Sequence, residues 1–486
     1  MATEPRSKER PKPEVRPDYC KGCGRCVGAC PHHAITPGSE LNPLTGLVPV
    51  EFDATCCNGC GLCVEACPEP YGLRIGGRTG PDVELVLDGA SPLDQAVNAV
   101  PRHETAPPPD VAAEAIALPD TRPLVVKGNH ASAIGAILAG CRHFFGYPIT
   151  PSTEGAELMA KLLPELGGQF VQAVSEVAAI NMMYGAGGAG KPCMTFTSSP
   201  GFSLMLEGIS YMIGAEVPGV IVNVMRGGPG LGNIAPEQAD IKLACRGLGH
   251  GNTHAITLAP ATPQEMLDFT RLAFELAFHW RNPVVILADG YLGQMTGKVT
   301  LPKTLTRPGV PSWCVPGDAA HRRNVICSID LAEADLEERN RRLDAKYAAI
   351  AHAEQRADLY RCDDADVLLV AANTPARMAK GAVRVLRDKG VAAGLFRPQT
   401  LWPFPVKHLL PLLPRVKKLV VVEASPGQLE DELRLALSHA DVRVGFDWGH
   451  VRRQGGVLPS QREIVEGVLG IVRKPARPAA AQEVRP

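Results

Sequence analysis

Eight cysteines near the start of the chain repeat one spacing twice, Cys-x2-Cys-x2-Cys-x3-Cys-Pro. The two runs consist of Cys20, Cys23, Cys26 and Cys30, and of Cys57, Cys60, Cys63 and Cys67. Thiolate sulfur is a soft ligand that suits iron, and the short spacers let one tight loop present three sulfurs to a cluster. A zinc site more often uses two separated pairs, and a disulfide framework is typical of secreted proteins. The spacing therefore favours iron–sulfur clusters, and with them one-electron chemistry, over both alternatives.

The double run resembles the ligand run of bacterial two-cluster ferredoxins, in which the fourth cysteine of each run binds the cluster of the other run. This resemblance implies two 4Fe–4S clusters with crossed ligands. One ligand set would be Cys20, Cys23, Cys26 and Cys67, and the other Cys57, Cys60, Cys63 and Cys30.

Three polar side chains further along the chain lie where a second site could be built. Thr150 lies in the turn Gly-Tyr-Pro-Ile-Thr-Pro-Ser-Thr, whose two prolines restrict the backbone. Glu176 begins a helical stretch rich in small residues, and Arg226 follows an apolar strand and opens a glycine-rich loop. An arginine at the carboxyl end of a strand lies where α/β proteins bind ligands, and its planar guanidinium suits a carboxylate. Taken alone, the turn also fits an ordinary helix cap, and the glutamate also fits the positive end of a helix dipole.

A glycine-rich stretch at 185–191, GAGGAGK, matches two nucleotide-binding patterns only in part. Pro192 stands where a phosphate-binding loop needs a hydroxyl, and the preceding EVAAINMMY predicts a helix where both patterns require a strand. We therefore expect close helix packing here, which weakens the alternative of a nucleotide-dependent oxidoreductase.

The composition is that of an ordinary soluble globular protein. The chain has 486 residues, a hydrophobic fraction of 45% and a net charge of −1. This length favours about three domains, and the neutral charge balance argues against a nucleic-acid or membrane-surface protein. No apolar run approaches the ~20 residues of a membrane span, and the charged, proline-rich N-terminus does not resemble a signal peptide. Cysteines scattered singly beyond the two runs fit a reducing cytoplasm.

Changes in sequence texture divide the chain into seven segments. Apolar, β-branched runs that alternate with helical stretches after residue 124 predict α/β units on largely parallel, buried sheets. The expected segments are a disordered arm at 1–16, a two-cluster ferredoxin domain at 17–80, a linker at 81–123, an α/β domain at 124–300, a connector at 301–361 with a long helix over 331–361, a second α/β domain at 362–471, and a disordered tail at 472–486.

Four segments together resemble the α subunit of the 2-oxoacid:ferredoxin oxidoreductases. They are GYPITPST at 146–153, SEVAAI at 175–180, RGGPGLGN at 226–233 and LFRPQTLWPFP at 395–405. The resemblance runs from about Gly128 to Glu466, so the chain resembles an α subunit fused to a ferredoxin-like δ subunit. It implies a thiamine-diphosphate pyrimidine-binding fold at 124–300 and a transketolase-C-terminal-like fold at 362–471.

The resemblance also implies a chemistry and residue roles. The reaction would be thiamine-diphosphate- and Mg²⁺-dependent oxidative decarboxylation of a 2-oxoacid, or its reverse, with the acyl group passing to coenzyme A and the electrons leaving through the clusters. Glu176 would hydrogen-bond the aminopyrimidine ring of the cofactor, Thr150 would line the site, and Arg226 would bind the substrate carboxylate.

Two departures from the family pattern bear on the substrate and the partners. Where many relatives carry threonines after the arginine, this chain has Leu231 and Ala235. That pattern is similar to branched-chain 2-oxoacid enzymes and favours a less polar pocket, with 2-oxoglutarate as the other candidate. No Gly-Asp-Gly occurs, since Asp289-Gly290 follows Ala288, so we expect a β subunit to hold magnesium and diphosphate.

Further expected partners are a γ subunit and ferredoxin or another low-potential electron acceptor. The alternative from a different functional class is a non-catalytic electron-transfer or scaffold subunit of a larger iron–sulfur complex.

Overall fold

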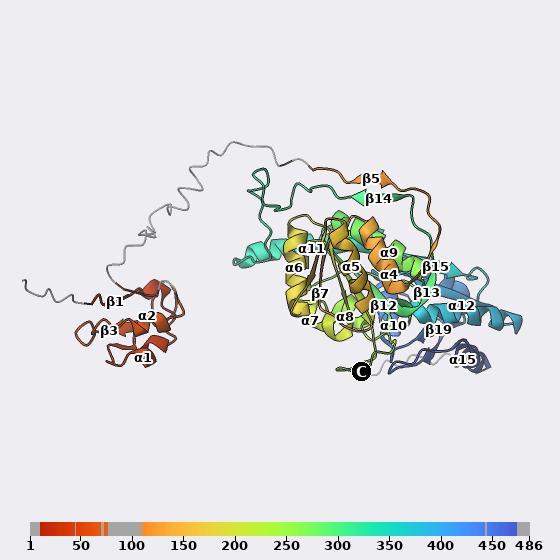
Figure 1. Cartoon of the computed structure of the whole chain (residues 1–486). Coiled ribbons are helices and arrows are strands. Elements are labelled where there is room, and N and C mark those ends of the chain that lie inside the picture. The colour runs from red at the N-terminus through yellow and green to blue at the C-terminus, as the bar shows by residue number, and fades with distance from the viewer. Residues whose placement is uncertain are drawn as a thin grey trace, which may run out of the picture. The chain divides into compact units, whose positions relative to one another are not determined.

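The computed structural model describes residues 10–43, 45–69, 72–75, 108, 110–442 and 445–473. The chain divides into two compact units, Met1–Thr105 and Ala106–Pro486 (Figure 1). Among the described residues, no helix is both long and apolar enough to cross a membrane.

The first unit consists of two similar halves, each built around a short helix that follows a cysteine loop. Its elements are β1 (Pro13–Val15), η1 (Pro17–Tyr19), α1 (Arg25–Ala29), β2 (Ile35–Pro37), β3 (Val50–Phe52), α2 (Leu62–Ala66) and β4 (Leu73–Ile75). Strand β1 pairs with β4, and β2 pairs with β3, both antiparallel. The backbone of Gly24 and Gly61 is left-handed immediately before the two helices, a conformation that favours glycine.

The larger unit contains a seven-stranded sheet that is parallel except at one edge. The strand order is β18 (Thr400–Trp402), β11 (Ile256–Leu258), β12 (Pro283–Asp289), β10 (Gly219–Met225), β9 (Cys193–Thr197), β7 (His143–Gly146) and β8 (Gln169–Gln172). The central strands β9, β10 and β12 are buried along their whole length, which is why their sequences are almost uninterrupted apolar runs.

Helices cover this sheet in two groups. One group consists of α4 (Gly128–Leu138), α5 (Thr153–Glu165) and α9 (Pro263–Trp280), with α4 packed between the other two. The other group pairs α6 (Glu176–Gly188) with α7 (Ser199–Gly214). The short helices α8 (Ile241–Arg246) and α10 (Gly290–Gln294) lie near the strand ends.

A five-stranded sheet forms the C-terminal part of this unit. Its order is β15 (Ala357–Tyr360), β17 (Ala393–Pro398), β16 (Val367–Val370), β19 (Lys418–Glu423) and β20 (Asp447–Arg452), with only β15 antiparallel to its neighbour. The helices that accompany it are α12 (Asn373–Asp388), α13 (Val406–Leu409), η2 (Leu410–Arg415), α14 (Gln428–His439) and α15 (Gln461–Arg473).

The two sheets of the larger unit are joined by buried contacts. Strand β18 comes from the C-terminal segment but pairs with β11 of the first sheet. The fully buried Asp289 at the end of β12 accepts hydrogen bonds from the backbone N–H of Thr374 at 2.9 Å and from its hydroxyl at 2.8 Å. These contacts tie the start of α12 to the carboxyl end of the first sheet.

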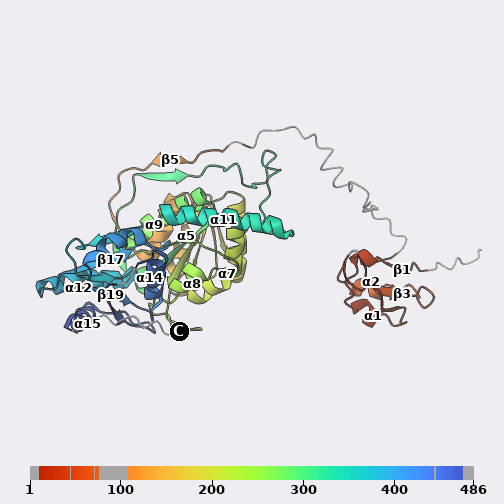
Figure 2. The same ribbon diagram turned by 180° about the vertical axis from the view of Figure 1, so that it is seen from behind.

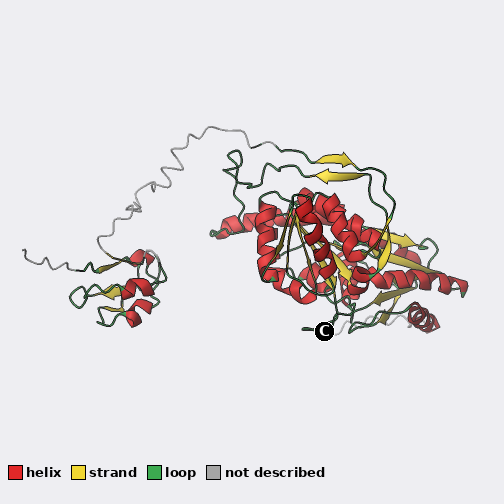
Figure 3. Ribbon diagram, viewed as in Figure 1, coloured by secondary structure: helices red, strands yellow, loops and turns green. Residues whose placement is uncertain are grey.

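Two antiparallel ribbons and a long helix lie outside the main sheets. Strand β6 (Leu124–Lys127) pairs with β13 (Thr296–Val299), and β5 (Glu114–Ala117) pairs with β14 (Thr304–Arg307). Figure 3 shows the β5–β14 ribbon away from the packed helices. Helix α11 (Glu333–Ala353) runs along the outside of the unit (Figure 2).

The structure differs from the sequence-based expectations at four segments. Residues 13–15, expected in a disordered arm, form β1, and 114–117, expected in a linker, form β5, because each finds a backbone partner distant in sequence. The helix expected over 331–361 ends at Ala353, and Ala357–Tyr360 instead form an edge strand against β17. Helix α15 reaches Arg473, slightly into the expected tail. Most of the expected linker and tail, 81–107 and 474–486, lies outside the described residues.

Candidate functional site

The eight cysteines of the first unit surround two separate cavities. One cavity is lined by Cys20, Cys23, Cys26 and Cys67. The other is lined by Cys30, Cys57, Cys60 and Cys63. These are the crossed sets expected from the spacing, because the fourth cysteine of each run lies across the unit against the other run. Within the described residues, no group of three or more His, Cys, Asp or Glu is placed to hold a single metal ion.

The environment of the sulfurs fits a bound cationic cluster. Burial, followed by the charges of neighbouring cysteines, raises the pKa of the Cys26 and Cys63 thiols, so a thiolate at either position needs a compensating metal. Backbone N–H groups of Val50, Ala34 and Gly59 point at Cys20, Cys30 and Cys57 Sγ, at 3.4, 3.4 and 3.3 Å. Such hydrogen bonds stabilise negative charge on the ligand sulfurs.

The two cavities differ in the polar residues beside the sulfurs. Lys21 and Glu69 line the first cavity and form an ion pair at 2.7 Å. His32 and Asn58 line the second, with His32 Nε2 and Asn58 Nδ2 2.8 Å apart. Clusters bound in the two cavities would therefore experience different local charge.

A second candidate site lies at the carboxyl ends of the parallel strands in the larger unit. Thr150 follows β7, Glu176 follows β8, Ser199 follows β9 and Arg226 follows β10. These four strands are neighbours in the sheet, and the carboxyl edge of a parallel sheet is where such folds bind ligands. The expected site residues are therefore brought to one edge by the strand order.

Arg226 joins two of the loops at this edge. Its Nη1 donates to the carbonyl oxygen of Thr150 at 2.9 Å, and its Nη2 donates to the carbonyl oxygen of Leu231 at 3.1 Å. The residue is only 9% exposed, and its buried Nε has no partner. Because Nε is fully enclosed, an anionic ligand would reach Arg226 through the second N–H groups of its two terminal nitrogens, which the carbonyl contacts leave unused. The Thr150 residue itself is exposed.

Glu176 is a buried carboxylate at the first turn of α6. It is 4% exposed, and the helix is capped by Ser175, whose Oγ accepts a hydrogen bond from the Ala178 N–H at 3.2 Å. Across the described part of the chain, no residue donates a hydrogen bond to the Glu176 carboxylate. The carboxylate oxygens are not among the fully enclosed unpaired atoms of the described residues, so they remain accessible, and a ligand that brings its own N–H group fits them.

A glycine keeps space for that carboxylate. A Cβ atom on Gly201 would lie 2.4 Å from Glu176 Oε1 and 2.4 Å from Thr197 Oγ1. The Thr197 hydroxyl is buried and also lacks a partner. The segment 197–201 thus lies against Glu176 on one side, and its Ser199 contacts Arg226 on the other, with the Arg226 N–H donating to Ser199 Oγ at 3.1 Å.

The turn that carries Thr150 is held by a polar network. The carbonyl oxygen of Pro151 accepts hydrogen bonds from Asn129 Nδ2 at 2.8 Å and Gln294 Nε2 at 3.1 Å. Glu154 accepts from both amides and from Lys127 Nζ at 3.1 Å. Burial alone would raise the pKa of the Glu154 carboxyl, but these hydrogen bonds outweigh it and hold the pKa below its ordinary value.

Two acidic residues of this site escaped the sequence analysis. Glu237 accepts from the backbone N–H of Gly228 at 3.2 Å and of Gly455 at 3.1 Å, so it fastens the glycine-rich loop to the C-terminal part of the unit. Asp240 accepts from the Ser199 hydroxyl at 2.6 Å. Their partners are far away in sequence, and only the preceding glycine-rich loop could have drawn attention to them.

The glycines of 185–188 belong to α6, as expected. A Cβ atom on Gly187 would lie 2.3 Å from the carbonyl oxygen of Pro218. Close packing of the helix on the segment before β10 therefore explains this glycine.

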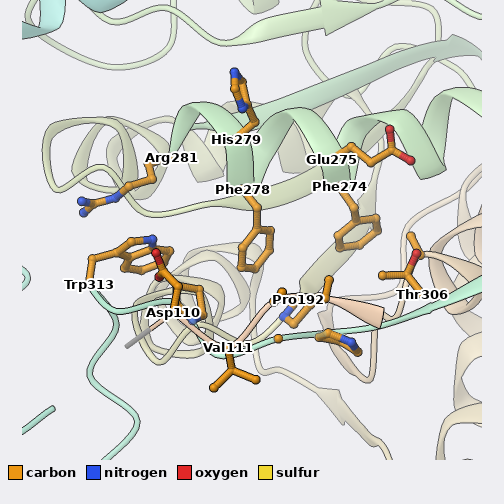
Figure 4. Close-up of a pocket in the computed structure, with 16 residues that line it drawn as sticks. Asp110, Val111, Pro192, Phe274, Glu275, Phe278, His279, Arg281, Thr306 and Trp313 are labelled. Carbon is orange, nitrogen blue, oxygen red and sulfur yellow. The ribbon is translucent and has the colours of Figure 1, made fainter. Parts of the chain in front are cut away.

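A largely apolar cavity lies elsewhere on the larger unit, between α9 and the extended segments at 110–113 and 306–313. Phe274, Phe278, Pro192 and Trp313 line it, and the Arg281 guanidinium lies 4.5 Å from the centroid of the Trp313 ring (Figure 4). Pro192 precedes β9, so this cavity is near the amino ends of the strands, opposite the edge with Thr150 and Arg226.

Comparison with known proteins shows which domain families the two units match. Residues 134–316 match the thiamine-diphosphate-binding domain of pyruvate flavodoxin/ferredoxin oxidoreductases, residues 365–464 match core domain II of pyruvate:ferredoxin oxidoreductase, and residues 19–71 match a 4Fe–4S dicluster domain. Ketoisovalerate oxidoreductase subunit VorB of Methanothermobacter marburgensis is 46% identical over 349 residues, covering 71% of this chain and 97% of the relative. The chain belongs to the 2-oxoacid:ferredoxin oxidoreductases.

Other members of the 2-oxoacid:ferredoxin oxidoreductase family agree with this assignment. The 2-oxoglutarate synthase subunit KorA of the same organism is 36% identical over 381 residues, covering 72% of this chain and all of the relative. The solved 2-oxoglutarate:ferredoxin oxidoreductase of Magnetococcus marinus, with 2-oxoglutarate, coenzyme A and succinyl-CoA bound, aligns with a TM-score of 0.66 at 27% identity. That alignment covers 72% of this chain and 65% of the longer solved chain.

The family assignment confirms the expected fold and cofactor classes. The first unit is a 4Fe–4S dicluster domain, and the seven-stranded sheet belongs to a thiamine-diphosphate-binding domain. The relatives are named as subunits, so this chain is one subunit of an oxidoreductase with several.

Proposed function

We propose that this chain supplies the cofactor's pyrimidine-binding half and the electron exit of an enzyme that oxidises a branched-chain 2-oxoacid to its acyl-coenzyme A. The overall balance is RCOCOO⁻ + CoASH → RCO–SCoA + CO2 + H⁺ + two electrons. Bound thiamine diphosphate would provide the electron sink for loss of carbon dioxide, and the two 4Fe–4S clusters would take the electrons one at a time.

The observation that carries this proposal is Glu176. It is buried, stands at the carboxyl edge of the sheet and has no donor within the described residues. The aminopyrimidine ring has nitrogen atoms that such a carboxylate can hydrogen-bond, and a carboxylate held there controls the proton at the ring nitrogen. A scaffold subunit has no use for a buried, unpaired carboxylate at this edge, which weighs against the non-catalytic alternative.

Arg226 is proposed to bind the carboxylate of the substrate. Its guanidinium is nearly buried and held in place by the Thr150 and Leu231 carbonyl oxygens, and its Nε–H remains without a partner. A fixed, desolvated guanidinium binds a carboxylate more strongly and more specifically than a mobile one does. Thr150 is proposed to line the space between this arginine and the cofactor.

The apolar character of the glycine-rich loop favours a branched-chain substrate. Leu231 is 82% exposed and Ile234 is 63% exposed, so both side chains are available to cover an alkyl group. The 46% identity to a ketoisovalerate oxidoreductase subunit supports the same substrate class. The second candidate is 2-oxoglutarate, which the solved relative at 27% identity binds.

A partner subunit is proposed to complete the site. The thiamine-diphosphate-binding domain here lacks a Gly-Asp-Gly sequence. We propose that a β subunit holds magnesium and the diphosphate, that a γ subunit can join the assembly, and that ferredoxin or a similar carrier accepts the electrons in the cytoplasm.

The test is a substrate panel with the complex purified anaerobically with its partner subunits. Coenzyme A-dependent viologen reduction would be measured with 2-oxoisovalerate, pyruvate, 2-oxoglutarate and an aryl 2-oxoacid. We expect kcat/KM to be at least about tenfold higher for 2-oxoisovalerate than for 2-oxoglutarate, since burial of an alkyl group contributes roughly 0.8 kcal/mol per carbon. A preference for 2-oxoglutarate would contradict the substrate assignment, and no turnover of any 2-oxoacid by the fully loaded complex would contradict the function.

A further inference from the structure

The Arg226 main chain is anchored by a buried polar chain that starts at Asp240. Asp240 Oδ2 accepts the Ser199 hydroxyl proton at 2.6 Å, and Ser199 Oγ in turn accepts the Arg226 backbone N–H at 3.1 Å. Because the single hydroxyl proton is engaged by the carboxylate, the oxygen lone pairs are directed at Arg226. The Ser199 hydroxyl also lies 3.4 Å from the Arg226 carbonyl oxygen, but the Asp240 carboxylate at 2.6 Å is the closer acceptor for its single proton.

A second contact ties the same carboxylate to β10, the strand that immediately precedes Arg226. Asn223 Nδ2 donates to Asp240 Oδ2 at 2.9 Å, three residues before Arg226 on β10. All three anchoring residues are buried, with exposed fractions of 6% for Asp240, 8% for Ser199 and 0% for Asn223. Asn223 is fully enclosed, whereas Ser199 and Asp240 also line a cavity beside the glycine-rich loop. Hydrogen bonds in such a largely buried network constrain position more strongly than they do in water.

The anchored end of the arginine is the base of the glycine-rich loop. The backbone of Arg226 forms an isolated antiparallel β-bridge with Pro236. The Gly227 N–H donates to the Ala235 carbonyl oxygen at 2.9 Å. The guanidinium then reaches from this fixed base to the carbonyl oxygens of Thr150 and Leu231. Because the guanidinium is at the end of a long side chain, a small rotation of the Arg226 backbone would displace the guanidinium by more than it displaces the backbone.

We propose that Ser199 and Asp240 are positioning residues for 2-oxoacid binding, acting through the backbone of Arg226. This inference rests on the proposed function, because it takes Arg226 as the group that binds the substrate carboxylate. The role does not require either residue to touch the substrate, although both line the cavity beside the glycine-rich loop. Their role is to keep the guanidinium where a carboxylate can be bound without reorganisation of the loop.

A double-mutant cycle tests this in the assembled complex. Ser199→Ala should lower kcat/KM for 2-oxoisovalerate about tenfold, the size of one well-placed hydrogen bond, mainly through KM. In an Arg226→Ala background the same substitution should change kcat/KM by less than about twofold, because the group it positions is absent. Asp240→Asn should repeat the pattern.

A matched control separates positioning from general damage. Ser210 is a serine of the same helix, 7% exposed, whose hydroxyl donates only to the Glu207 carbonyl oxygen at 2.6 Å. Ser210→Ala should leave KM unchanged. Iron content and the melting temperature would be measured for every variant, and binding of isovalerate, a non-reactive carboxylate, would be measured by calorimetry where turnover is too slow.

The outcomes distinguish the positioning role of Ser199 and Asp240 from the carboxylate-binding role of Arg226. An equal loss from Ser199→Ala in both backgrounds, or no loss in the wild type, would overturn the positioning role. Unchanged kcat/KM in Arg226→Ala alone would instead overturn the carboxylate-binding role of Arg226 in the proposed function.

Discussion

At the residue scale, the site is defined by side chains whose hydrogen-bonding capacity the chain leaves unused. Glu176 is buried without a donor, and Arg226 Nε and Thr197 Oγ1 are buried without partners. Unsatisfied buried groups lower stability, and proteins keep them chiefly at functional sites. Their convergence at one edge of the sheet is a stronger indication of a ligand than any one of them alone.

The space beside Glu176 yields a prediction for thiamine diphosphate binding. Gly201→Ala places a methyl group 2.4 Å from Glu176 Oε1, so the carboxylate must move away from the position in which it meets the cofactor. We expect the dissociation constant for thiamine diphosphate, measured by calorimetry on the complex, to rise at least about tenfold, or roughly 1.4 kcal/mol. Gly185→Ala in α6 is the control, since its Cβ meets nothing within 4 Å. Equal affinity in the two variants would contradict the placement of Glu176.

At the element scale, strand order does most of the positioning, and the loops do the rest. The parallel order of β8, β7, β9 and β10 brings four loops to one edge, and each loop is then fixed by side chains from elsewhere in the chain. The Thr150 turn is the clearest case, because Asn129, Gln294 and Glu154 come from three different helices.

The Glu154 network gives this turn a predicted pH dependence. Because the folded-state pKa of Glu154 lies below its ordinary value of 4.5, its carboxylate stabilises the fold above that pH and loses this effect as pH falls through the folded pKa. The melting temperature of the wild type should therefore exceed that of Glu154→Gln above pH 4.5, and the difference should shrink below it. Glu157→Gln, an exposed position on the same helix, should follow the wild type. A difference that stays constant at low pH would contradict the account.

The sequence predicts a strand correctly where its pattern of apolar residues matches its burial in the fold. The apolar runs that became β10, β12, β16 and β19 were expected as buried strands, since burial on both faces leaves little choice of residue. The edge strands β5 and β15 were missed because each has only four residues, Glu-Ala-Ile-Ala and Ala-Asp-Leu-Tyr. Such short segments show no clear pattern, and a partner strand distant in sequence supplies their hydrogen bonds.

In the two candidate sites, residues in a recognisable local pattern could be predicted, and residues whose role depends on distant partners could not. The two cysteine runs are visible from their short spacing, and the crossing of the fourth cysteines follows from the resemblance to two-cluster ferredoxins. Asp240 and Glu237 could not be predicted, since their partners lie 41 and 218 residues away and an acidic residue after a glycine-rich loop has no fixed meaning. Glu176, Thr150 and Arg226 were identified through family resemblance, and their roles remain predictions.

At the scale of the whole molecule, one chain combines the pyrimidine-binding half of a decarboxylase site with two sites for clusters. A covalent fusion keeps the electron acceptor at a high effective concentration near its donor. The same chain lacks a Gly-Asp-Gly sequence for magnesium and diphosphate, so we expect electrons to reach its clusters only when a partner subunit is present.

The most direct measurement is reduction of the chain's own clusters by substrate. Visible absorbance and electron paramagnetic resonance of the anaerobic complex would be recorded after 2-oxoisovalerate and coenzyme A are added. We predict that the clusters become reduced in the wild-type complex, and that they remain oxidised in the isolated chain and in the Glu176→Ala complex, although iron content is the same. Equal cluster reduction in Glu176→Ala, or none in a wild-type complex with thiamine diphosphate bound, would contradict the account.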